Sequence, residues 1–146
     1  MLTYRDYVYA AFTDYAAAQA ALVTIPEQIE VERLRRETIR AQKTDGDRVQ
    51  GGALEGDEAW LSSIAKTDYL TRKLEECCQK VRTMSKLIED LEDDERDIVT
   101  RLIIQKRRNG VGELAEDWGV DERTVFRAKD RTLKKLARML TGEARA

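Results

Sequence analysis

The 146-residue chain contains no histidine, one proline and two cysteines, and each shortage excludes something. Without histidine it lacks the commonest general base and the commonest metal ligand. No serine lies in a nucleophile motif, so we expect no enzyme, no cofactor and no bound metal. Cys77 and Cys78 are adjacent in a helical pattern, where side chains point about 100° apart. We therefore expect no disulfide and a reducing, intracellular setting, with Cys77 buried and Cys78 exposed.

The chain also lacks a long apolar run and any segment that alternates with the period of a β-strand. No stretch approaches the roughly 20 apolar residues of a membrane span. Asp14 and Gln19 interrupt the alanine-rich start, so we predict no secretion signal, no contact with a membrane and a cytoplasmic location. The scarcity of proline and the abundance of alanine, leucine, glutamate, lysine and arginine predict an all-α fold.

Apolar spacing predicts two helices within residues 1–43, over residues 3–23 and 26–43. The apolar positions of the first helix are Tyr4, Val8, Phe12, Tyr15 and Leu22. Thr24 or Pro26 marks a break, because proline suits the first turn of a following helix. Four glycines in residues 44–57 then predict a linker. No strand precedes this segment and no GK[ST] follows it, so a nucleotide-binding loop is not expected.

Residues 57–92 carry apolar side chains alternately four and three residues apart, as in the seam of a coiled coil. The seam consists of Leu70, Leu74, Cys77, Val81, Met84, Ile88 and Leu91. A helix of this kind packs either on the N-terminal helices of its own chain or on a second copy in a homodimer. The sequence leaves both arrangements open.

The net charge of −2 conceals a difference between the two parts of the chain. Residues 1–94 carry 13 basic and 19 acidic side chains, whereas residues 95–146 carry 13 basic and 9 acidic ones. Between Arg123 and Arg138 there are seven basic residues and a single acidic one, Asp130. A further basic run occupies residues 106–108. Basic groups concentrated in this way attract a phosphate backbone.

Residues 111–130, within the region 93–146, have the spacing of a DNA-binding helix-turn-helix. Gly119 lies where a helix-ending residue with positive φ is wanted, and Asp121 lies where the next helix needs a cap. The inward positions are Leu114, Ala115, Trp118, Val120, Val125 and Ala128, and the outward ones are Glu122, Arg123, Phe126, Arg127 and Asp130. An ordinary pair of helices turning a corner shares some of these features, but the basic residues favour DNA binding.

Two further helical segments complete this region. A helix after the acidic break at residues 92–96 is expected to end near Lys106. Its apolar residues are spaced to cover the helix-turn-helix, and they are Ile98, Val99, Leu102 and Ile103. The last helix is expected to begin near Glu122, to continue through Leu140 and to end at Gly142.

The segment 91–136 resembles region four of bacterial sigma factors. The positions that match are Glu95-Arg96, Leu114-Ala115, Gly119-Val120, Thr124-Val125 and Leu133 to Leu136. With the long helix before it and the linker Asp47-Arg48-Val49-Gln50, the chain is similar to phage transcriptional regulators of the RinA and ArpU type. Asp121 departs from the usual serine or threonine cap, and Phe126 from a usually polar position. The resemblance implies an activator of phage late genes that works with RNA polymerase in a bacterial host cell.

The candidate DNA contacts lie on the last helix and on the basic run. Arg123 and Arg127 are suited to guanine, because a guanidinium can bond O6 and N7 together. Glu122 could accept a hydrogen bond from cytosine, and Phe126 could touch a thymine methyl group or pack on a partner. Phosphate contacts are expected from Arg107, Arg108, Lys129, Arg131 and Lys134, and Thr124 completes the candidate set.

Two other functions fit the same pattern. A phage packaging protein of the small terminase subunit type also joins a helix-turn-helix to oligomerising helices, and it would form large rings. A protein-interaction module would present its basic helix to polymerase without reading DNA. Particle mass separates a monomeric or dimeric regulator from a packaging ring, and DNA binding separates both from the interaction module.

Overall fold

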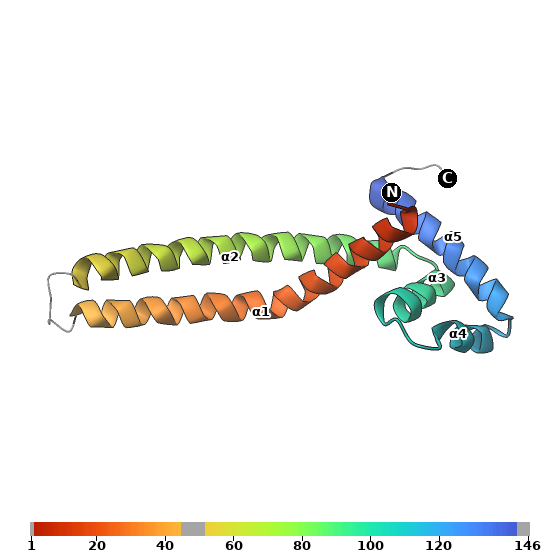
Figure 1. Ribbon diagram of the computed structural model, residues 1–146, viewed down its shortest axis with the longest axis horizontal. Coiled ribbons are helices and arrows are strands. Elements are labelled where there is room, and N and C mark those ends of the chain that lie inside the picture. The colour runs from red at the N-terminus through yellow and green to blue at the C-terminus, as the bar shows by residue number, and fades with distance from the viewer. Residues whose placement is uncertain (1, 45–51, 143–146) are drawn as a thin grey trace. The chain divides into compact units, whose positions relative to one another are not determined.

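The computed structural model describes residues 2–44 and 52–142, and in these residues the chain is all-α, as predicted (Figure 1). Two long helices come first, and they are α1 (Tyr4–Thr44) and α2 (Gly52–Glu89). Four short segments follow, and they are α3 (Asp93–Ile98), the π-helix η1 (Val99–Ile104), α4 (Gly110–Trp118) and α5 (Glu122–Thr141). None of the helices in the described ranges has the length and apolar character needed to cross a membrane.

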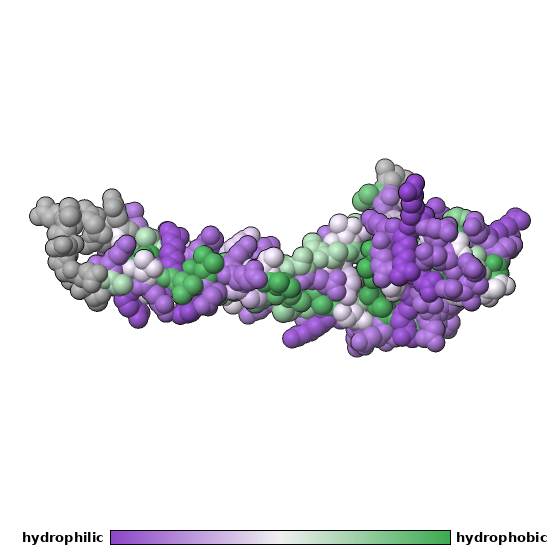
Figure 2. Space-filling model, turned by 90° about the horizontal axis from the view of Figure 1, so that it is seen from below, coloured by the Kyte–Doolittle hydropathy of each residue, from purple (hydrophilic) through white to green (hydrophobic). Residues whose placement is uncertain are grey.

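The chain forms two compact units, and both long helices contribute to each. Among the described residues, the C-terminal unit contains residues 2–17 and 81–142, and the hairpin unit contains residues 18–44 and 52–80. On the face shown in Figure 2, apolar patches interrupt the polar surface of the hairpin unit. Its exposed large apolar side chains are Val23, Val31, Leu34, Leu61, Ile64 and Tyr69.

The predicted break at Thr24 or Pro26 is wrong, because α1 continues through both residues. Proline in a helix removes one backbone hydrogen bond and crowds the preceding turn. The exposed Pro26 is tolerated here because the flanking turns bury a seam with a spacing of seven residues. The buried members of this seam in the hairpin unit are Ala18, Ile25, Glu32 and Ile39.

The predicted linker is too long at its C-terminal end. Helix α2 begins at Gly52, so residues 52–57 are helical. A glycine in a helix costs about 1 kcal/mol relative to alanine, and alanine, leucine and glutamate stand between Gly52 and Gly56. Gly46 and Gly51 lie outside the described residues. At its other end, α2 stops at Glu89, close to the predicted boundary.

The predicted seam of α2 is covered within the single chain. Leu70, Met84 and Leu91 are buried, and the other four seam residues are half-buried. In the C-terminal unit, Met84 and Leu91 share a core with Val8 of α1, so the seam packs on the N-terminal helix of its own chain. Cys77 and Cys78 are both half-buried free thiols, which corrects the expected contrast between them.

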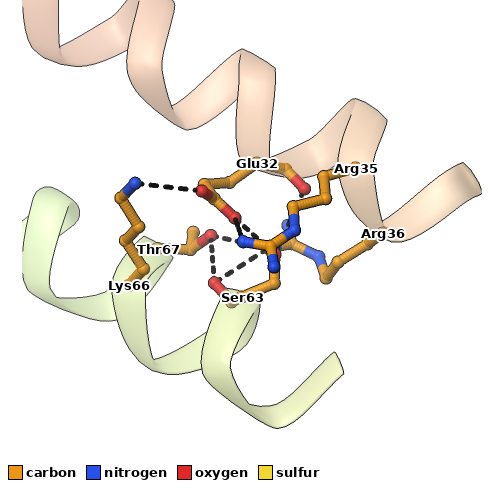
Figure 3. A network of polar contacts seen from close by, with 6 residues as sticks. All are labelled: Glu32, Arg35, Arg36, Ser63, Lys66 and Thr67. Carbon is orange, nitrogen blue, oxygen red and sulfur yellow. Dashed lines mark hydrogen bonds and ion pairs between the residues drawn. The ribbon is translucent and has the colours of Figure 1, made fainter. Parts of the chain in front are cut away.

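A buried carboxylate lies between the two helices of the hairpin unit (Figure 3). Glu32 of α1 is 3% exposed and faces Ser63 of α2, which is fully buried. The Ser63 hydroxyl donates to Glu32 Oε2 at 2.7 Å, and Lys66 Nζ lies 3.3 Å from Glu32 Oε1. Because the Ser63 hydrogen bond and the charges of Lys66 and Arg35 favour the carboxylate, the pKa of Glu32 is lowered despite burial.

Arg36 completes this network one turn further along α1. Its Nη1 donates to Thr67 Oγ1 at 2.6 Å, and it also lies within hydrogen-bonding distance of the Ser63 carbonyl and hydroxyl oxygens. These bonds form only when residues 32 and 36 of α1 stand opposite residues 63 and 67 of α2. The network therefore fixes the register of the hairpin, because a slip of one turn would leave buried polar groups without partners.

We expect Glu32→Gln to reduce the free energy of unfolding by about 2 kcal/mol at pH 7, because a hydrogen-bonded, ion-paired carboxylate is lost. The folded-state pKa of Glu32 lies below its ordinary value of 4.5. Its stabilisation is therefore full above that value and is lost as pH falls through the lower, folded-state pKa. The difference between variant and wild type should shrink between pH 7 and pH 3 in urea unfolding followed by circular dichroism.

The matched control is Glu30→Gln, which removes an exposed ion pair with Arg33 on the same helix. It should change stability far less than Glu32→Gln, because exposed pairs contribute little. Equal effects of the two variants at pH 7 would contradict a special role for the buried network.

Candidate nucleic-acid interface

The turn between α4 and α5 has the geometry predicted for a helix-turn-helix. Gly119 ends α4 with φ 67°, in the left-handed region that favours glycine. The N–H of Val120 donates to the Ala115 carbonyl oxygen at 3.0 Å, which closes the end of α4. Asp121 caps α5, because its Oδ1 accepts the Thr124 N–H at 2.9 Å. The Thr124 hydroxyl bond and this backbone bond lower the pKa of Asp121.

The faces of α4 and α5 that point toward each other form a small core. Leu114 and Val125 are fully buried, and Ala115 and Ala128 are nearly so. The half-buried Trp118 packs against them. Val120 is not an inward residue as predicted, because it is 38% exposed. Its backbone hydrogen bond closes the turn, and its side chain is left in solvent.

The helical segment that precedes α4 joins this core to the rest of the C-terminal unit. Ile98 and Leu102 enter the helix-turn-helix core, as predicted. Val99 and Ile103 instead enter a second core with residues of α1, α2 and α5, which corrects the prediction that all four cover the pair. Ile98 and Leu102 lie four residues apart and share one helix face, and Val99 and Ile103 share the neighbouring face, so one segment serves two cores.

This segment ends at Ile104, close to the predicted boundary, but its geometry differs from that of an α-helix. Residues 99–104 are π-helical, and the Gln105 N–H donates to the Thr100 carbonyl oxygen at 2.9 Å. Lys106 then takes φ 49°, a left-handed conformation that costs a residue with a side chain about 1 kcal/mol or more. The chain turns back so closely that a Cβ at Gly110 would lie 2.5 Å from Leu102 Cδ2. This turn places the basic run beside α5.

The basic run and α5 together line a groove of about 350 Å³. The structure brings five of the predicted site residues to it, and they are Arg107, Arg108, Glu122, Phe126 and Lys129. Lys106 also lines the groove, although it was predicted only as part of the basic run and not as a DNA contact. Its left-handed backbone, which brings the run against α5, has no signal in the sequence. Phe126 is 54% exposed, as predicted for an outward residue.

Five further predicted residues lie on the exposed surface of α5 but outside the groove. Arg123, Arg127, Arg131 and Lys134 are spaced by four, four and three residues, so they form one basic strip along the helix. Lys134 Nζ pairs with Asp130 Oδ2 at 3.1 Å. Thr124 is exposed, but its hydroxyl donates to Asp121 and therefore serves the cap.

Asp130 is not the free outward residue that the sequence predicts. The Tyr4 hydroxyl donates to Asp130 Oδ1, and Arg5 Nη2 lies 3.0 Å from the same oxygen. The hydrogen bond from Tyr4 has the largest effect and that from Arg5 the next largest. Together they hold the pKa of Asp130 well below its usual range. The contact neutralises the one carboxylate in the basic stretch of α5. Periodicity could not reveal it, because it joins residues 126 positions apart.

No known protein family, characterised protein or solved structure matches this chain. The chemistry of the interface therefore indicates what it can bind. Among the described residues, no cluster of cysteine or carboxylate side chains is placed to hold a metal ion. What the C-terminal unit does present is a capped helix with an exposed basic strip and an adjoining basic groove, and these features suit a polyanion.

We expect Lys106→Gly to be more stable than Lys106→Ala by about 1 kcal/mol, because glycine adopts the left-handed backbone without strain. Both variants lose the same charge, so they form a matched pair for urea unfolding. If the two unfold at the same urea concentration, residue 106 is not held in the left-handed conformation.

Proposed function

We propose that this protein is a sequence-specific DNA-binding regulator of transcription that uses α5 as its recognition helix. The observation that carries the proposal is the basic strip, which stays exposed while the opposite face of α5 is buried against α4 and η1. A capped helix whose first turns carry exposed arginines can enter the major groove of DNA with those turns at the base edges.

Arg123 and Arg127 are our candidates for reading bases. They lie in the first two turns of α5, and neither has an ion-pair partner within the described part of the chain. An arginine in this position can bond guanine O6 and N7 together. Arg131 and Lys134 lie further along the strip, where contacts to phosphates would set the register of the helix on the duplex.

Glu122 and Thr124 have more restricted roles in this proposal. Glu122 lines the groove at the start of α5, where its charge is favourable to the helix dipole. From there its carboxylate could accept a hydrogen bond from cytosine. The Thr124 hydroxyl proton is engaged by Asp121, so only its oxygen lone pair and its methyl group remain for a contact with DNA.

The resemblance to sigma region four and to phage regulators of the RinA and ArpU type extends this proposal to the biological role. On that basis the protein activates phage or prophage late genes together with RNA polymerase. The hairpin unit is our candidate for the contact with polymerase or with a second copy of this chain. It carries the exposed apolar residues described above, and such residues are typical of interaction surfaces.

Fragmented genomic and phage DNA, captured by the purified protein and sequenced at several salt concentrations, tests the proposal. We expect a short shared motif near promoters, with binding that weakens steeply as salt rises because counterions are released. If no DNA is enriched at any salt concentration, the basic helix does not read DNA. The protein-interaction alternative, with polymerase as the first partner to test, would then replace this proposal.

Replacement of Arg127 by alanine should weaken binding to the recovered motif by about 1–3 kcal/mol and relax base preference at one position. Selection from randomised duplexes measures the preference, and competition titration measures the affinity. Arg72→Ala is the control, because Arg72 is an exposed arginine of α2 in the hairpin unit. Unchanged affinity and preference in Arg127→Ala would defeat the assignment of this recognition face.

A further inference from the structure

The groove between the basic run and α5 has a composition that differs from that of the basic strip beside it. We propose that this groove is a subsite for one phosphate group, whose neighbouring base contacts Phe126. This inference rests on the proposed function, which makes the DNA backbone the source of the phosphate. It differs from general attraction to DNA because it assigns a single phosphate and a single neighbouring base to one set of side chains.

The positive charges that line the groove differ in whether they are already paired. Lys106, Arg108 and Lys129 have no ion-pair partner among residues 2–44 and 52–142. Arg107 is partly engaged, since its Nη1 lies 3.0 Å from Glu113 Oε2 and its Nε donates to Gln105 Oε1 at 2.6 Å. Several cationic side chains gathered in one groove, most of them without a partner, make it a favourable place for an anion.

The backbone at the start of α4 also lines the groove. The first hydrogen bond of this helix joins the Glu113 N–H to the Asn109 carbonyl oxygen at 3.0 Å, so the N–H groups of Val111 and Gly112 precede it. The Asn109 side chain does not cap them. A Cβ at Gly112 would lie 2.6 Å from Asn109 Oδ1, so the Asn109 side chain lies close against this turn. Amides in this position add to the attraction that the four cations exert on an anion.

The groove also has an aromatic side chain among its charged ones. Phe126 is an exposed apolar residue with cationic groups on both sides of the groove that it lines. A phosphate held by Arg108 and Lys129 would bring the attached nucleotide to the same place, where Phe126 offers an apolar surface to a base edge such as a thymine methyl group. Phe126 thereby gains a role in base preference that depends on the phosphate.

Glu122 decides where in the groove the phosphate can lie. It is the single carboxylate among the lining residues, against four cationic side chains. Its charge repels an anion from the first turn of α5 and leaves the side formed by the basic run as the favourable position. Arg108 is thus the lining residue whose loss should affect the phosphate most, because Arg107 is already shared with Glu113.

The test uses the full chain and a duplex that carries its recovered motif. A series of duplexes is made in which one phosphate at a time is replaced by an uncharged methylphosphonate. We expect one position at which the replacement weakens wild-type binding about tenfold, as for the loss of a charge-assisted hydrogen bond. In Arg108→Ala that same replacement should have almost no further effect, because the group that holds the phosphate is already gone.

Two variants make this result specific. Arg131→Ala, on the basic strip outside the groove, should remain sensitive to the replaced phosphate. Phe126→Ala should change base preference only at the base pair next to it. If Arg108→Ala remains as sensitive as the wild type at every position while the wild type binds the motif, the subsite is refuted and the proposed function stands.

If the wild type binds no duplex, the proposed function fails. A second measurement then tests the phosphate subsite by itself. Inorganic phosphate is titrated at low salt while the amide resonances of Val111 and Gly112 are followed by NMR. Saturable shifts that vanish in Arg108→Ala would support a subsite that takes a free phosphate group. Amide resonances that do not move would overturn the subsite.

Discussion

The C-terminal unit depends on one short stretch of helix that enters two cores. Ile98 and Leu102 hold α4 and α5 together, while Val99 and Ile103 pack with α1 and α2. The first pair ties this stretch to the helix-turn-helix core, and the second ties it to the core that α1, α2 and the later part of α5 (Leu133, Leu136) form. Polar contacts at the edge of α5 join it to neighbouring helices as well. Lys135 Nζ, for example, lies 2.8 Å from Glu95 Oε1 of α3. Because two cores share one backbone, the position of α5 is fixed from two sides.

In the hairpin unit, a buried polar network fixes the register of α1 against α2. Its α1 seam repeats every seven residues, but one of the positions is Glu32, and the position that faces it on α2 is Ser63. Apolar periodicity gives weight only to hydrophobic residues, so it did not join Ile25, Glu32 and Ile39 into one seam, and the proline then favoured a break at Thr24 or Pro26. A buried carboxylate is acceptable once a hydroxyl and a lysine satisfy it, and this depends on residues of another helix. The seam of α2, which is apolar almost throughout, was by contrast predictable.

In the candidate site, contacts between residues close in the sequence could be predicted, and contacts between distant residues could not. Gly119, Asp121 and the buried positions of α4 and α5 follow from rules that act within a few residues, and the structure bears them out. The groove does not follow from such rules, because it needs the left-handed Lys106 and the close approach at Gly110. The pairing of Asp130 with Tyr4 joins opposite ends of the chain. The predicted inward position of Val120 is wrong because a backbone hydrogen bond closes the turn without its side chain.

The distribution of charge shows how a chain with a net charge of −2 can present a surface for a polyanion. At physiological salt the Debye length is about 8 Å, so a bound polyanion responds to charges near the contact and hardly to the total. On α5, the carboxylate of Asp130 accepts a hydrogen bond from Tyr4 and is ion-paired with Arg5 and Lys134, whereas Arg123 and Arg127 have no ion-pair partner among the described residues. The ion pairs of Asp130 thus offset the one negative charge between Arg123 and Arg138, while the charges of Arg123 and Arg127 stay available. It is this local pairing, more than the basic count of residues 95–146, that makes α5 attractive to a phosphate backbone.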